Sequence, residues 1–226
     1  MGKLFFIISV IILPLLFFLY ALYKKNVIPF ILGVVAFSCS QLLIRIPLIN
    51  FIAKESSTYQ FWSATKPMLI LFLLALSAGI FEETARWLAM RFFLKTYTLR
   101  NGILFGLGHG GIEAVTIVGI PVVVNYFYIM QPFQLYMSGI ERLCAMGIHV
   151  CLSIFVLIAV RQGKFIYCSY AILLHATVNF ATGFVAMHTT PLMTEVCLVV
   201  LSTAVILITY LFWRRKKDEK VLYHTY

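Results

Sequence analysis

Seven long apolar runs, separated by short polar stretches, account for almost the whole chain. They cover residues 4–23, 28–53, 67–94, 102–130, 139–160, 165–187 and 191–213. Each run is long enough to cross the hydrocarbon core of a bilayer as a helix, and several have residues to spare for tilt or bending. The pattern predicts an all-α, polytopic transmembrane helical bundle of seven spans. Pro14, Pro47 and Pro121 are candidate kinks within it.

Composition agrees with this pattern and narrows the class of protein. Hydrophobic residues make up 62% of the 226 residues and charged residues only 12%, which excludes an ordinary soluble domain. The net charge of +10 would indicate nucleic-acid binding only if the basic residues formed a patch outside the membrane. They lie in short loops instead. We therefore predict one multi-pass domain over residues 1–226 in the cell membrane, surrounded by the lipid bilayer and without a nucleic-acid partner.

The basic residues are distributed unequally between the two sides of the predicted membrane. Of the 18 Lys and Arg residues, twelve lie in loops or tails on one side, three on the other and three within spans. Cytoplasmic loops carry the excess of Lys and Arg in membrane proteins. This asymmetry predicts an N-terminus outside and a C-terminus in the cytoplasm, as an odd number of spans requires.

Three ionisable residues occur within five positions of the third span. A residue such as Asp or Arg at the centre of a spanning helix costs about 2.5–3.5 kcal/mol on insertion scales. Glu82 and Glu83 precede Arg86 by four and three positions, so all three side chains share one helical face and can pair. One pair would be enough to fix helix packing, which is the alternative interpretation. The second glutamate is not needed for packing, so it indicates a catalytic or binding role.

Polar residues one helical turn apart recur in two later spans. His109 and Glu113 lie on one face of the fourth span, and His175 and Asn179 on one face of the sixth. The fifth span carries His149 near its middle, where a hydrogen-bonded core histidine is an equally good interpretation. Glycine is frequent around His109, which lets another backbone approach closely or leaves room for a substrate.

The depths of these residues in the membrane agree with one another. Counted from span ends on the predicted cytoplasmic side, the depth is roughly 17–18 Å for Glu82 and Glu83, about 10 Å for His109 and about 15 Å for His175. Polar residues with independent structural roles have no reason to share a depth, whereas the members of an active site do. We therefore expect these side chains to face one polar cavity.

Three motifs in chain order carry a resemblance to known membrane peptidases. They are the EExxR sequence 82–86, the FxxxH sequence 105–109 and the HxxxN sequence 175–179. The order resembles the peptidases related to CAAX-processing and bacteriocin-processing enzymes, although their first motif, EExxxR, is one residue longer. The EExxK of PrsW-type membrane proteases is closer in spacing. With FEETARW, GHGGIEA, the ER pair at 141–142 followed by His149, and LLHATVNF, residues 81–180 most resemble the YhfC family of membrane peptidases.

The resemblance implies hydrolysis of a peptide bond in a membrane-associated protein or peptide. The catalytic residues that it implies are Glu82, Glu83, His109, His175 and Asn179, with Arg86 in an orienting role. Glu82 would activate a water molecule with the help of His109, while His175 and Asn179 would donate hydrogen bonds to the tetrahedral oxyanion. This preferred mechanism requires no cofactor.

Two alternatives stay open. Members of the YhfC family are often described as metalloproteases, and a zinc site built from His109, Glu113, His149 and His175 would use ordinary zinc ligands. The sequence lacks HExxH, and its five cysteines lack CxxC spacing, so a thiolate site is not supported. A different class of protein is a proton-coupled transporter or a non-catalytic membrane immunity protein, because buried Glu and His residues also serve as proton relays.

Overall fold

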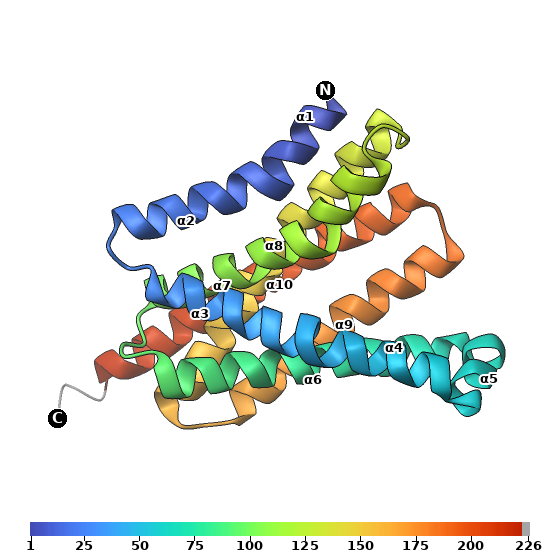
Figure 1. The fold of residues 1–226 in the computed structure, drawn as a ribbon. Coiled ribbons are helices and arrows are strands. Elements are labelled where there is room, and N and C mark those ends of the chain that lie inside the picture. Colours follow the sequence, from blue (N-terminus) through green and yellow to red (C-terminus); the bar gives the residue numbers. More distant parts are fainter. Residues whose placement is uncertain (223–226) are drawn as a thin grey trace.

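The computed structural model describes residues 1–222, with side chains described through residue 215. Helices and the segments that join them make up this part of the chain, which contains no strand. Seven helical runs are long and apolar enough to span a membrane, namely Gly2–Tyr23, Ile28–Glu55, Pro67–Phe93, Leu99–Tyr126, Pro132–Gln162, Ile166–His188 and Pro191–Arg215. The predicted all-α bundle of seven spans is confirmed (Figure 1).

Three spans contain π-helical turns next to the predicted kinks. The first span consists of α1 (Gly2–Ile7), η1 (Ile8–Ile12) and α2 (Leu13–Tyr23). The second span consists of α3 (Ile28–Phe37), η2 (Ser38–Arg45) and α4 (Ile46–Glu55). The fourth span consists of α7 (Leu99–Glu113), η3 (Ala114–Gly119) and η4 (Val122–Tyr126). Pro14, Pro47 and Pro121 each lie within two residues of a π-helical segment. A wider turn accommodates the proline ring and its missing N–H.

The remaining elements are α5 (Ser57–Thr65), α6 (Pro67–Phe93), α8 (Pro132–Gln162), α9 (Ile166–His188) and α10 (Pro191–Leu222). The predicted start of the fifth span at residue 139 was wrong, because α8 begins at Pro132. Gln131 and Gln134 form a capping box there, and proline suits the first helical position. Glu141 and Arg142 therefore lie more than two turns from the start of the helix, where Arg142 is buried and Glu141 stays partly exposed.

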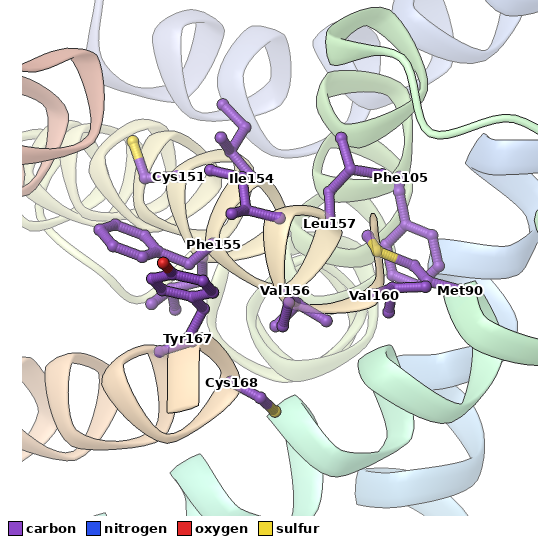
Figure 2. Close-up of a cluster of buried hydrophobic side chains, with 14 of the residues drawn as sticks. Met90, Phe105, Cys151, Ile154, Phe155, Val156, Leu157, Val160, Tyr167 and Cys168 are labelled. Atoms are coloured by element: carbon purple, nitrogen blue, oxygen red, sulfur yellow. The ribbon is translucent and has the colours of Figure 1, made fainter. Parts of the chain in front are cut away.

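Helix α8 lies at the centre of the bundle, in contact with α1, α6, α7, α9 and α10. Every residue from Cys151 to Val160 is buried, as expected for a helix that is apolar all round. Figure 2 shows this half of α8 packed against Met90, Phe105 and Tyr167 from three other helices. The end of the bundle that holds the α6–α7 and α8–α9 loops is therefore filled with apolar side chains.

The orientation of the spans across the membrane is a testable prediction. Cysteines added near Ser56 and near Lys216 should react with a membrane-impermeant thiol reagent from opposite sides, because the asymmetry of Lys and Arg puts residue 56 outside. Accessibility labelling in intact cells and in inverted vesicles measures this directly. Labelling of both sites from the same side would contradict the seven spans in their predicted orientation.

Candidate active site

Helix α6 carries the charged residues of the third span on a face that packs against α9. Glu83 and Arg86 are fully buried, and Arg86 Nη1 donates to Glu83 Oε2 over 3.0 Å. This is the i,i+3 pair that the spacing predicts. Gly79 lets α9 approach, since a Cβ there would lie 2.6 Å from the carbonyl oxygen of Ile172. Glu82 does not join the pair but turns to other helices.

The carboxylate of Glu82 links the second, third and fourth spans. Its Oε1 accepts a hydrogen bond of 2.6 Å from Nε2 of Gln41 on η2, and its Oε2 lies 2.9 Å from Nε2 of His109 on α7. All three residues are buried. The contact between Glu82 and His109 agrees with the predicted convergence of the motifs, whereas Gln41 is a partner that the sequence analysis did not identify.

Glycines bring α7 close enough for His109 to enter the site. A Cβ at Gly108 would lie 2.1 Å from a carbonyl oxygen of α3, and one at Gly106 would lie 2.4 Å from Cα of Val150 on α8. Only glycine permits such backbone approach. Gly106 thereby sets α7 against the turn of α8 that carries His149, and the two imidazole rings lie with centroids 4.8 Å apart.

His149 lies between an arginine and a glutamate. Arg86 Nη2 is 3.1 Å from His149 Nδ1, and His149 Nε2 contacts Glu113 Oε2. Because a guanidinium group only donates, Nδ1 must accept, and these partners assign the proton of the neutral imidazole to Nε2. Glu113 in turn accepts from Arg142 over 3.0 Å, and Arg142 also donates to Glu141. The packing of α8 thus brings His149 into the site, as the zinc alternative requires.

His175 is oriented by Glu83. Its Nδ1 is 2.8 Å from Glu83 Oε1, and since the carboxylate paired with Arg86 accepts, Nδ1 donates. The other ring nitrogen, Nε2, then carries the lone pair of the neutral imidazole and lies 3.9 Å from Glu82 Oε1. Asn179, one turn further along α9, lines the same cavities as Glu82.

Four of these residues form a group that can hold a metal ion. Glu82, His109, Glu113 and His149 each offer one ligand atom, and the four atoms lie within 4.8 Å of one another. Imidazole nitrogen and carboxylate oxygen are ordinary ligands of zinc, at distances of about 2.0–2.2 Å. The donor types therefore fit a divalent ion, although His149 would first have to release one ring nitrogen from its contact with Arg86 or with Glu113. The group differs from the predicted zinc set in one member, because Glu82 takes the place of His175.

Two cavities meet at this group. One of about 310 Å³ is lined by Gln41, Arg45, Glu82, Glu113 and Asn179 together with apolar residues. The other, of about 200 Å³, is lined by Glu82, Glu113, Asn179 and by side chains of α8 and α10. The lining of the first includes Arg45 and Leu71, toward the ends of the spans next to α5, and that of the second includes Thr182, toward the α9–α10 loop. Water and substrate have space on this side of the group.

The structure thus brings every residue of the predicted site to one place, and their catalytic roles stay predictions. It adds Gln41 and Arg45, and it places Arg142 and Glu141, the ER pair of the family resemblance, beside Glu113. A signal for Gln41 and Arg45 was present in the sequence. Gln41 and Arg45 are polar residues four positions apart within an apolar span, the same pattern that singles out His109 with Glu113.

The amino-acid sequence is similar to proteins of one known family. The family model described as YhfC intramembrane metalloprotease matches residues 5–132 and 126–202. The uncharacterized membrane protein YhfC of Bacillus subtilis (strain 168) is 32% identical over 162 residues, which cover 58% of this chain and 60% of that protein. The matched region is therefore less than two thirds of the length of this relative. No solved structure matches the chain significantly.

Proposed function

Because the chain belongs to the YhfC family of intramembrane metalloproteases, we propose that it is a membrane protease whose metal ion is held by Glu82, His109, Glu113 and His149. The observation that carries this proposal is the convergence of four ligand atoms, from three separate spans, within 4.8 Å. The substrate is a peptide bond of a membrane-associated protein or peptide that enters through the cavities beside Glu82. A bound zinc ion would supply Lewis-acid chemistry, polarising the carbonyl group and making water a stronger acid.

The remaining polar side chains have roles that follow from their contacts. Glu83 holds Nδ1–H of His175, so the free Nε2 can take a proton from the attacking water and return it to the leaving nitrogen. Asn179 has an amide group at the cavity wall that can donate to the oxyanion. Arg86 compensates the charge of Glu83 and holds His149, so it fixes two members of the site at once.

The metal-free mechanism is the second candidate. The direct hydrogen bond of 2.9 Å between Glu82 and His109 favours it, because this pair alone could activate water as base and orienting partner. The two candidates make opposite predictions for chelators, so one experiment separates them.

We expect the purified protein to contain a divalent metal ion in near-stoichiometric amount and to lose it on substitution His149→Ala. Removing one ligand from a group of four weakens the hold on the metal, and a chelator should stop cleavage of membrane-embedded peptides. Elemental analysis after gel filtration measures the metal content. His188→Ala is the matched control, since His188 lies on the exposed end of α9 and bonds only the carbonyl of Phe184 among the described contacts.

A protein that cleaves peptides while free of metal, and that chelators leave unchanged, would favour the metal-free mechanism instead. If no member of a library of membrane-embedded peptides is cut, with metal or without, the protease assignment is wrong. The proton-coupled transporter and the immunity protein would then be the functions to test.

A further inference from the structure

Two polar residues of the second span form a chain of hydrogen bonds that ends at Glu82. Gln41 and Arg45 lie four residues apart on η2, the π-helical segment of this span, and both face α6. Gln41 is buried, with 3% of its surface exposed, although glutamine is costly in a membrane span unless its amide is satisfied.

The guanidinium group of Arg45 contacts both α6 and Gln41. Its Nη2 donates to the carbonyl oxygen of Leu74 over 2.7 Å, and its Nε donates to Oγ of Ser77 over 3.1 Å. Its Nη1 donates to Oε1 of Gln41 over 3.0 Å. Both anchors lie on α6 within three turns of Glu82. The contacts therefore form a closed ring that runs from α6 through Arg45 and Gln41 and back to α6.

This ring leaves only one orientation for the amide of Gln41. A guanidinium group only donates hydrogen bonds, so the group of Gln41 that faces Arg45 must be the oxygen. The NH₂ group then faces Glu82 and donates to Oε1 over 2.6 Å. The other oxygen of Glu82 stays free of Gln41 and faces the imidazoles, at 2.9 Å from His109 Nε2 and 4.0 Å from His149 Nδ1.

We propose that Gln41 is a positioning residue that holds one oxygen of Glu82 so that the other faces the metal-binding group, and that Arg45 fixes Gln41 in the orientation that can do so. The inference rests on the proposed function, since it assigns Glu82 to a metal site. Hydrogen-bonding partners of metal-binding side chains commonly change metal affinity by about 10–100-fold when they are removed.

The test compares metal affinity among variants of the full-length protein in detergent. Zn²⁺ affinity is measured by competition with a chromophoric chelator, and the visible absorption of bound Co²⁺ reports the ligand geometry. We expect Gln41→Met to weaken Zn²⁺ binding about 10–100-fold and to change the Co²⁺ spectrum, because methionine fills the space but cannot donate to Glu82. Leu43→Met is the matched control, since Leu43 lies on the same segment with 70% of its surface exposed.

Arg45 provides the second arm of the test. Arg45→Met should weaken Zn²⁺ binding no more than Gln41→Met does, and adding it to Gln41→Met should cause no further loss, because Arg45 acts through Gln41. Arg45→Lys should retain most of the affinity, since an ammonium group can still donate to the amide oxygen of Gln41. If Arg45 only joined two helices, Arg45→Met would lower thermal stability. Its effect on Zn²⁺ affinity would then not depend on Gln41, and Arg45→Lys would not restore that affinity.

The outcomes separate this inference from the proposed function. Wild-type affinity and an unchanged Co²⁺ spectrum in Gln41→Met would overturn the inference alone, as would losses from Gln41→Met and Arg45→Met that simply add. A wild-type protein that binds neither Zn²⁺ nor Co²⁺ would overturn the proposed metal site and this inference with it.

Discussion

Replacing Glu82 by Gln is expected to reduce peptide cleavage by about 1000-fold or more, within the range associated with loss of an acid–base or charge-stabilising group. Glutamine keeps the shape of the side chain, and its oxygen can still accept from Gln41. The other half of its amide then presents NH₂ to His109, where the native protein presents a carboxylate oxygen. The substitution removes both the charge and the proton-accepting oxygen from the centre of the site.

The measurement is cleavage of membrane-embedded peptides by purified protein in liposomes, with thermal unfolding recorded for each variant. Glu55→Gln is the control, because Glu55 ends α4 in an exposed ion pair with Lys54, outside the site. Activity that survives Glu82→Gln and Glu83→Gln together would end the assignment of the protein as a peptidase of this type.

The largest effect on stability is expected for Arg86→Met. Arg86 and Glu83 have no exposed surface, so the substitution leaves a carboxylate buried without its counter-charge. Removing one member of a buried ion pair costs about 3–5 kcal/mol of unfolding free energy. His149 also loses the donor to its Nδ1, which adds an unsatisfied acceptor to the same place.

Unfolding in detergent by a titrated denaturant measures this free energy. Arg91→Met on the same helix is the control, since Arg91 is exposed near the end of α6. Adding Glu83→Gln to Arg86→Met should recover part of the loss, because the uncompensated charge is removed. Equal effects of Arg86→Met and Arg91→Met would show that the buried ion pair contributes nothing to stability.

The convergence of the site could be predicted because helical geometry converts spacing into direction. Polar residues four apart, such as His175 and Asn179, must share a face, and that face must avoid lipid. Depth along each span then places the faces in one layer. This reasoning needs only hydropathy and a rise per residue, so it predicted that these side chains lie together without knowledge of which spans are neighbours.

Pairing between side chains could not be predicted in the same way. Glu82 had Arg86 as its obvious partner by sequence spacing, yet its oxygens contact Gln41 and His109 instead. The choice depends on which helices lie beside α6 and on how the helices are rotated about their axes. Hydropathy contains no information on that rotation.

The contact between Gln41 and Glu82 could not be predicted for a related reason, although the spacing of Gln41 and Arg45 was visible in the sequence. The second span changes to π-helical geometry at Ser38, which alters the angle between successive side chains relative to an ideal helix. A face calculated with 3.6 residues per turn drifts away from the real face across such a segment. The early start of α8 was missed because turn-forming polar residues around Gln131 and Pro132 obscure a helix that continues well into apolar sequence.

The apolar half of α8, from Cys151 to Val160, also determines which aqueous compartment can supply the reaction. A site that hydrolyses peptides needs water in the middle of a bilayer, and a continuous file of water would leak protons and dissipate the membrane potential. The buried, apolar segment would oppose the passage of water on one side, while the two cavities, with their polar side chains, would admit it on the other. If the predicted orientation and the proposed hydrolysis both hold, the water for the reaction would come from outside the cell, and the membrane would stay sealed against the cytoplasm.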